Sequence, residues 1–359
     1  MTIIDDPAPS GDDFVLGPAT RLLWRSPHSI HLELGEQAVV VEGLPASAVS
    51  RVVAHHPPPD PAASDPAITR ALVDLADAGY LWPRIPESGE YREPGPAGDH
   101  SDPRRAPPHP RLAGELTALA VTHAERAAEV LAARGQASVV VHGRSRAAAH
   151  LGAVLAAAGV GRVHCVAGGT VRLHQAMPGG VLPGDEGLDL SVAADTALHR
   201  AAPEVDTTPP PPDQAPDLTV LAIDAPIDDD RRVALHAAGA AHLVVSLGAD
   251  RGTVGPLVLP GLTSCLRCAD LHRRDRDPAW SALAVQLTVP RRGGSGSDVA
   301  VSTVVVGAAA LQALAFLDGG DPACVDGTLE LRLPDWRLRR RSRPPHPDCD
   351  CALPADPGR

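Results

Sequence analysis

The chain has 359 residues, which suits two domains and gives enough sequence to bury a sizeable core. Its basic side chains are all arginine, because the sequence contains no lysine, and it contains no asparagine either. These absences exclude a P-loop lysine, a Schiff-base lysine and a kinase-type lysine with its magnesium-binding asparagine. The formal net charge of −12 argues against a general nucleic-acid binder. The run Arg337–Arg343 is a local exception, which we expect in a strand with one solvated face.

Two segments bear on the compartment. Residues 1–13 are acidic and lack the basic and apolar regions of a signal peptide, so we expect a disordered arm. The stretch Val299–Leu317 has no charge, but it is flanked by acidic residues and is rich in small side chains. We therefore expect a buried core helix and no membrane span. These features predict a cytoplasmic protein with reduced cysteines.

Residues 14–85 are predicted to form a small module. Apolar and polar residues alternate from Ile30 to Leu34, and the apolar run Ala38–Val41 follows a short turn, which is typical of a β-hairpin. Helices are expected at Ser47–His55 and after Asp65, which can cap the second helix. This pattern predicts a winged-helix-like module, and the acidic balance favours a peptide, or no ligand at all, over DNA. Residues 86–110 are rich in proline and glycine and are expected to be a linker.

Residues 111–355 are predicted to form the large domain. Buried strands alternate with helices, which is typical of an α/β protein with a Rossmann-like, mostly parallel sheet. A proline-rich stretch at Pro203–Pro216 is expected as a surface loop. The first helix is expected at Leu112–Arg134, and the strands are expected at Ser138–His142, Arg162–Val166, Asp217–Ile223 and His242–Leu247.

Four cysteines carry the clearest chemical signal. Cys265 and Cys268 form one pair, and Cys349 and Cys351 form a second pair near the C-terminus. Two such pairs can complete a tetrahedral four-thiolate site for zinc, which would leave no open position and would therefore be structural. His272 and His346 lie nearby in sequence and are alternative ligands. Cys165 and Cys324 are expected to be small buried hydrophobic side chains.

A strand-loop-helix at Val139–Leu151 resembles a nucleotide-binding loop. In a G-x-G-x-x-G loop the glycines allow a tight turn and close phosphate approach, but here only Gly143 is present. Arg144, Ser145 and Arg146 follow it, so the segment is a degenerate site, an arginine-based phosphate site or simply a strand-to-helix turn. The next strand ends in Val166–Gly169, where the ribose-binding acid of such a site would be expected and is missing.

These motifs occur in an order that resembles a known superfamily. The glycine loop is followed by Asp224-Ala225-Pro226, by Gly255–Gly261, and by the two cysteine pairs. This order resembles the ThiF/MoeB/ubiquitin-activating-enzyme superfamily, whose members adenylate a C-terminal carboxylate. The segment Thr263–Trp280 more closely resembles an actinobacterial branch described as cyclodehydratase-like or leader-peptide-binding, from thiazole- and oxazole-forming peptide pathways. The resemblance implies a zinc-bearing Rossmann-like fold, a peptide-recognition module before it, and a homodimer.

Departures from the family pattern shape the functional prediction. Adenylating relatives use a lysine, an asparagine and a ribose-binding acid, and this chain has no counterpart for them. These losses make ATP and Mg²⁺ doubtful cofactors. Asp224 and Asp228 are the candidates that remain near the magnesium position. We predict a pseudoenzyme without catalytic residues that binds a precursor peptide and presents it to an ATP-using partner of the YcaO type. The alternatives are an ATP-dependent adenylyltransferase and a structural or regulatory protein without either ligand.

Overall fold

The computed structural model describes residues 14–17, 19–26, 29–34, 37–42, 74–75, 78, 80–83, 109–223, 227, 229–287, 297–335 and 337–351. The chain divides into two compact units, Met1–Ala132 and Ala133–Arg359. The predicted arm, the helix at Ser47–His55 and nearly all of the linker lie outside the described residues. The predicted domain boundaries stay a prediction.

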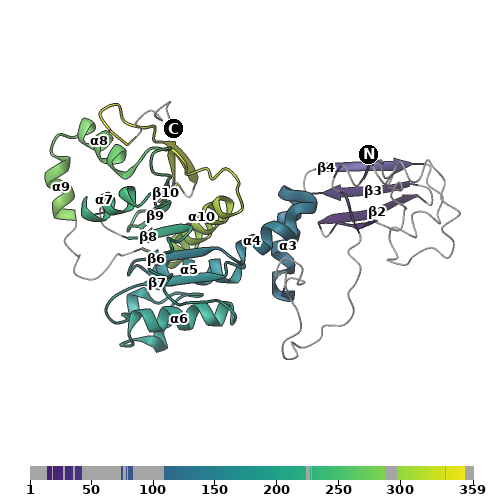
Figure 1. Cartoon of the computed structure of the whole chain (residues 1–359), viewed down its shortest axis with the longest axis horizontal. Coiled ribbons are helices and arrows are strands. Elements are labelled where there is room, and N and C mark those ends of the chain that lie inside the picture. Colours follow the sequence, from purple (N-terminus) through teal and green to yellow (C-terminus); the bar gives the residue numbers. More distant parts are fainter. Residues whose placement is uncertain are drawn as a thin grey trace, which may run out of the picture. The chain divides into compact units, whose positions relative to one another are not determined.

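The N-terminal unit contains a three-stranded antiparallel sheet in the order β2-β3-β4 (Figure 1). The strands are β2 (Thr20–Ser26), β3 (Ser29–Leu34) and β4 (Gln37–Glu42). β3 and β4 form the predicted hairpin, with Leu34 opposite Gln37, whereas β2 was not predicted. Leu32 is fully buried on the apolar face of β3, as the alternation predicted. A second pair of strands, β1 (Phe14–Leu16) and β5 (Leu81–Pro83), is also antiparallel.

Two helices replace the single helix predicted at Leu112–Arg134. α3 spans Ala113–His123 and α4 spans Ala127–Arg134. Between them Ala124 has a left-handed φ of 47°, which ends α3. Alanine is the strongest helix former, so its helix propensity does not signal this break.

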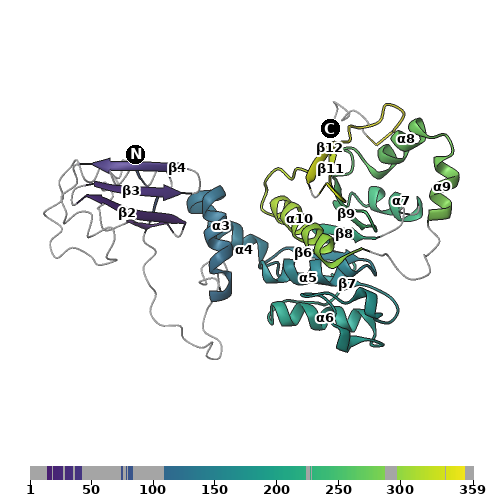
Figure 2. The ribbon, with the colours of Figure 1, turned by 180° about the vertical axis from the view of Figure 1, so that it is seen from behind.

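The C-terminal unit is built on a seven-stranded sheet in the order β12-β11-β10-β9-β8-β6-β7 (Figures 1 and 2). β6, β7, β8 and β9 are parallel, as an α/β fold predicts, but β10, β11 and β12 are antiparallel, so the sheet is mixed. The strands are β6 (Ser138–His142), β7 (Arg162–Val166), β8 (Leu218–Ala222), β9 (His242–Leu247), β10 (Arg251–Val258), β11 (Gly327–Arg332) and β12 (Leu338–Ser342).

Helices pack on both faces of this sheet. α5 (Arg146–Ala157), α6 (Leu190–Ala201) and α10 (Val299–Leu317) share one apolar core with Val139, Val141 and their neighbours (Figure 2). Leu221 and Val258 point into a second core with α8 (Leu266–Arg276) and with Leu235 of α7 (Asp229–Ala237). α9 (Trp280–Leu287) follows α8. Alternate strand residues therefore serve opposite faces, as the two-residue period of a strand requires.

The uncharged segment Val299–Leu317 and the arginine run Arg337–Arg343 are more exposed than their predictions imply. By length and composition, α10 is a candidate membrane span among the described residues. One face is packed in the core as predicted, with Val305, Ala309 and Ala313 almost fully buried, while Val304 and Leu311 remain exposed. The arginine run forms β12, the outer strand of the sheet among the described residues, and its five residues are all exposed. Both faces of that strand are therefore exposed to solvent, whereas one solvated face was predicted.

A buried ion pair joins the end of α4 to the end of α10. Arg134 is 3% exposed, and its Nε and Nη2 donate to the carboxylate of Asp318 at 3.0 and 2.6 Å. Its Nη1 donates to the carbonyl oxygen of Ala158 at 2.8 Å. The pair is bidentate and both side chains are nearly inaccessible to water. Removal of one partner would therefore leave the other as an unpaired buried charge.

We expect Arg134→Ala to lower the free energy of unfolding by about 3–5 kcal/mol, because Asp318 would be left buried and unpaired. Urea unfolding of the whole chain, followed by circular dichroism, measures this change. Arg126→Ala is the control, because the Arg126 side chain is 69% exposed and lies 3.7 Å from Glu129. The control substitution should lower the free energy of unfolding by less than about 1 kcal/mol. Equal costs for the two variants would contradict the assigned role of the buried pair.

Candidate functional site

The chain changes direction across the sheet between β6 and β8. β6 is followed in sequence by β7 on one side, and β8 then pairs with the other side of β6. In open α/β sheets ligands bind beyond the carboxyl ends of the strands at such a switch point. The segments that follow β6 and β8 are therefore the candidate ligand-binding edge.

Gly143 occupies the first position after β6. A Cβ atom at this residue would overlap the carbonyl oxygen of Ala222, the last residue of β8, and the φ of Gly143 is 151°. Only glycine allows the two backbones to approach this closely. Ser145 then precedes α5, and its side chain forms no capping hydrogen bond. The close contact between β6 and β8 therefore requires glycine at position 143, whether or not the loop binds a nucleotide.

The two arginines of the loop have different surroundings. Arg144 is exposed, and a Cβ atom at Gly169 would lie 2.9 Å from its Nη2, so its guanidinium lies over the loop that follows β7. Arg146 donates from its Nε to the carbonyl oxygen of His174 at 3.1 Å and from its Nη1 to that of Ser297 at 3.0 Å. Arg144 is therefore available to an anion, whereas Arg146 already has backbone partners.

The structure does not describe the two acidic residues predicted near this site. Asp224 and Asp228 lie outside the described residues, so their positions near a magnesium ion stay a prediction. Gly143, Arg144 and Ser145 are brought to the same edge by the chain itself. Among them, the guanidinium of Arg144 is the cation that can meet a phosphate or carboxylate.

One residue at this edge was missed by the sequence analysis. His142 ends β6, and burial, followed by the nearby Arg231 and His164, lowers its pKa to about 4. Its Nδ1 is buried and has no hydrogen-bond partner in the described part of the chain. The imidazole is therefore neutral at pH 7. A polar residue that ends a buried parallel strand was the available sequence signal.

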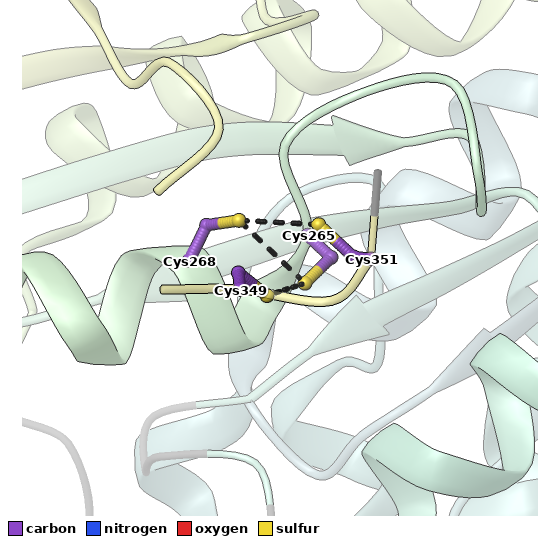
Figure 3. Close-up of side chains that lie close together, drawn as sticks. All are labelled: Cys265, Cys268, Cys349 and Cys351. Atoms are coloured by element: carbon purple, nitrogen blue, oxygen red, sulfur yellow. Dashed lines mark hydrogen bonds between the residues drawn. The ribbon is translucent and has the colours of Figure 1, made fainter. Parts of the chain in front are cut away.

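The four predicted cysteines come together beside α8. Cys265 is the N-cap of α8 and Cys268 lies in its first turn, while Cys349 and Cys351 belong to the segment after β12 (Figure 3). Their Sγ atoms all lie within 4.8 Å of one another. The Sγ of Cys265 is 3.9 Å from that of Cys268 and 3.6 Å from that of Cys349, and the Sγ atoms of Cys268 and Cys351 are 3.3 Å apart.

This spacing matches a tetrahedral metal site, in which thiolates 2.3 Å from zinc are roughly 3.8 Å apart. Burial raises the pKa of the Cys349 thiol to about 11, so a shared cation would be needed to hold several thiolates together. At Cys268 burial acts in the same direction, but hydrogen bonds lead by that from the His346 backbone lower its pKa. The cluster can hold a metal ion, and with four sulfur ligands it would have no open position.

The two nearby histidines have other partners. His346 is buried, and its Nε2 is 2.7 Å from Asp275, while its Nδ1 accepts a hydrogen bond from the backbone N–H of Asp348. The Nε2 of His272 is 2.9 Å from the carbonyl oxygen of Pro344. Together with Asp275 the two histidines form a separate group that could hold a metal ion, and the alternative that they complete the cysteine site stays a prediction. His346 also orients the segment that carries Cys349.

The two remaining cysteines are buried in apolar surroundings. Burial raises the pKa of Cys165 to about 12 and that of Cys324 to about 11. A thiol that stays protonated at neutral pH is a poor nucleophile, so both behave as the small hydrophobic side chains predicted from the sequence.

Comparison with known proteins identifies the fold. No protein-family model matches the chain, and no curated protein matches it. Among solved structures, Escherichia coli MccB with ATP is 14% identical, with a TM-score of 0.66, and the match covers 95% of this chain and 100% of MccB. The microcin C7 biosynthetic enzyme MccB in complex with N-formylated MccA matches with a TM-score of 0.65 and the same identity. PaaA matches at 14% identity with a TM-score of 0.60 over 90% of this chain.

These likenesses show that the chain has the MccB fold, in agreement with the ThiF-type fold that the sequence implied. They do not distinguish the thiazole- and oxazole-forming branch from other branches. The prediction that ATP is a doubtful cofactor gains no support from them, since one of the matched MccB structures contains ATP.

The lowered pKa of His142 makes stability depend on pH. The unfolded chain binds a proton near the ordinary histidine pKa of 6.5, while the folded chain binds it only near pH 4. The folded state is therefore disfavoured as the pH falls from 6.5 towards 4, and the contribution is fully present above 6.5. We expect His142→Gln to reduce the acid-induced fall in the urea midpoint between pH 7 and pH 4.5.

The exposed His174 supplies the control for this measurement. His174→Gln should leave the acid-induced fall unchanged, whereas His142→Gln should remove a part of it. The removal is partial because burial also lowers the pKa of His150 and His242. Identical pH profiles for wild type and His142→Gln would contradict the assignment.

Proposed function

We propose that the chain is a leader-peptide-binding scaffold with a degenerate ThiF-type adenylation domain. The N-terminal unit binds a ribosomally made precursor peptide, and the chain presents it to an ATP-dependent YcaO-type enzyme for thiazole or oxazole formation. The observation that carries the proposal is the likeness to peptide-bound MccB over 95% of this chain and 100% of MccB, so that both units have counterparts. The protein is proposed to work in the cytoplasm and as a homodimer.

The N-terminal sheet supports peptide binding by its open edges. Among the described residues, β2 and β4 are the outer strands of the three-stranded sheet, so each has one side without a neighbouring strand. An extended peptide can add to such an edge through backbone hydrogen bonds. Leu23 of β2 is 43% exposed and supplies an apolar contact beside that edge.

The residues at the candidate ligand-binding edge favour the proposal that the chain has little or no adenylating activity. Arg146 is held by two backbone carbonyl groups, and the sequence has no lysine or asparagine to supply further contacts to phosphate. Removal of one preorganised charge-stabilising donor typically costs about 100–1000-fold in rate. Such losses are not simply multiplied, but two or three together leave little activity.

We further propose that the cysteine cluster binds a structural zinc ion. Cys265, Cys268, Cys349 and Cys351 supply four sulfur ligands, which is a donor set that zinc prefers. The ion would neutralise the thiolates and attach the C-terminal segment to α8. No redox or catalytic role is assigned to it, because all four positions are filled by protein.

Elemental analysis of the purified chain should find one zinc ion per chain, and Cys265→Ser should lower both the zinc content and the melting temperature. Cys324→Ala is the control, because Cys324 is buried outside the cluster and should leave the zinc content unchanged. A metal-free chain with the stability of the native protein would refute the zinc site.

A second candidate function is ATP-dependent adenylation of a peptide C-terminus. The likeness to MccB with ATP favours it, together with the position of Gly143 and Arg144 at the switch point of the sheet. In this reaction a carboxylate oxygen attacks the α-phosphorus of ATP. The bond from that phosphorus to the bridging oxygen breaks, and pyrophosphate leaves. In this second proposal we assign Arg144 to the phosphates, because it is exposed at the switch point of the sheet.

Pyrophosphate exchange separates the two candidates. The full chain is incubated with ATP, labelled pyrophosphate and a panel of candidate precursor peptides, and peptide binding is measured in parallel by fluorescence anisotropy. We expect peptide binding without exchange above background, and unchanged binding by Arg144→Ala.

Two results would overturn this expectation. Exchange that falls about 100–1000-fold in Arg144→Ala but not in the exposed control Arg251→Ala would establish adenylation. Absence of both peptide binding and exchange would favour a structural or regulatory protein.

A further inference from the structure

We propose that the chain binds an acidic, extended peptide segment of a partner protein along β12. The binding face, here called the arginine surface, is made by β12 with neighbouring residues of β11 and α8. Its members are Arg273, Arg276, Arg332, Arg339, Arg341 and Arg343. It belongs to the C-terminal unit, and its use does not depend on the proposed function.

The register of β11 and β12 places these charges on one face. Glu330 pairs with Arg339 and Thr328 pairs with Arg341. Since alternate strand residues share a face, Arg343 lies on the same side of β12 as Arg339 and Arg341. The opposite face of β11 carries Leu329 and Leu331, which pack in the core with α10.

One buried carboxylate anchors three of the arginines. The side chain of Glu330 is 7% exposed and accepts hydrogen bonds from Arg332, from Arg341 at 2.7 Å and from Arg343 at 3.2 Å. One negative charge therefore holds three positive charges, and two remain unbalanced. Arg339 has a separate partner, Asp335, at 2.6 Å on the surface.

Of the two α8 arginines, Arg276 adds to this excess, whereas Arg273 forms an ion pair with Asp270 at 2.8 Å. Arg343 is only 20% exposed, and its pKa is lowered first by burial and then by the nearby Arg273, with Arg276 adding to the effect. This crowding of like charges is unfavourable for the isolated chain. An anion on the surface would relieve the repulsion and would be bound more tightly for that reason.

The guanidinium groups keep donors for such an anion. Arg341 is half exposed and donates to Glu330 through its Nε, while Arg343 donates through one Nη group. A guanidinium has five N–H donors arranged as a fork, so most of them remain for a carboxylate. Bidentate pairs of arginine and carboxylate are among the stronger hydrogen bonds in proteins.

The backbone of β12 selects an extended partner. β12 is the outer strand of the sheet in the described part of the chain, and all five of its residues are exposed. Charged side chains on an edge strand discourage pairing with a second copy of the same strand, because like charges would meet. A strand with acidic residues at alternate positions would add to the same edge and satisfy both the backbone groups and the arginines. The net charge of −12 disfavours nucleic acid as the ligand.

The cysteine cluster supports both sides of this surface. α8 carries Arg273 and Arg276 as well as Cys268, and Arg343 leads into the segment that holds His346 and Cys349. The Sγ of Cys268 and the backbone of His346 are directly hydrogen-bonded at 3.3 Å. The cysteine cluster therefore joins the α8 part of the arginine surface to the segment that follows β12.

The experiment uses the full chain and a fluorescein-labelled octapeptide of alternating glutamate and threonine. Anisotropy titrations in about 50 mM and about 150 mM salt should show binding that weakens as salt rises. Arg276→Gln/Arg339→Gln should bind about tenfold more weakly, because two charge-assisted contacts are lost without disturbing Glu330. Arg172→Gln/Arg200→Gln is the matched control, since it makes the same change in net charge at two exposed arginines that follow β7, at the opposite end of the sheet, and should bind as wild type does.

A second variant and two further probes make the test decisive. Arg341→Gln should also weaken binding, and circular dichroism confirms that each variant is folded. A peptide with proline in place of threonine should bind several-fold more weakly, because each proline lacks a backbone N–H and holds φ near −65°, away from the value of about −140° of an antiparallel strand. Equal affinity of the double variant and its control would overturn the proposal, as would absence of binding at low salt. Tighter binding of single-stranded DNA of equal charge would overturn the peptide assignment.

Discussion

Strands β6 and β8 pair directly in the middle of the sheet, and Gly143 lets the backbone after β6 pass against the carbonyl group of Ala222. β7 is thereby placed on the far side of β6, and α5 and α6 are placed over the core that lines one face. The carboxyl ends of β6 and β8 then form a shared edge at which His142, Gly143 and Arg144 meet. A side chain at position 143 would separate these strands, so the candidate site and the fold depend on the same contact.

Arginine is the sole strongly basic residue of the chain. Some arginines form structural contacts inside the fold, and others are exposed to solvent. Arg134 is buried against Asp318 and holds two helix ends together, while Arg146 binds backbone carbonyl groups near the candidate nucleotide edge. Arg144 and the arginine surface stay accessible to solvent. A guanidinium can serve in both settings because it stays charged when buried and has several donors in fixed directions. The likeness to MccB thus does not imply that each basic side chain at this edge contacts a ligand.

The C-terminal segment depends on contacts with α8 that are formed by residues distant in sequence. Cys268 receives a hydrogen bond from the backbone of His346, whose ring nitrogens are in turn engaged by Asp275 and Asp348. These contacts set the path that brings Cys349 and Cys351 to Cys265 and Cys268. They also keep β12 next to α8. The cysteine cluster and the arginine surface are therefore consequences of one local packing arrangement.

Local pattern in the sequence predicted the β3–β4 hairpin, the buried parallel strands and the pairing of the two cysteine motifs. Each of these depends on side-chain period, turn chemistry or ligand spacing, which act over a few residues. The break at Ala124, the antiparallel half of the sheet and strand β2 were not predicted, because helix propensity and apolar pattern do not encode the neighbour on which an element packs. The sequence by itself determined the α/β class, the four-sulfur donor set and the absence of lysine and asparagine chemistry. Only the tertiary structure decided that Arg146 binds backbone carbonyls while Arg144 is exposed to solvent, that His346 supports the cysteine cluster, and that Glu330 binds three arginines. Those roles depend on distances between residues far apart in the chain, which are set by packing.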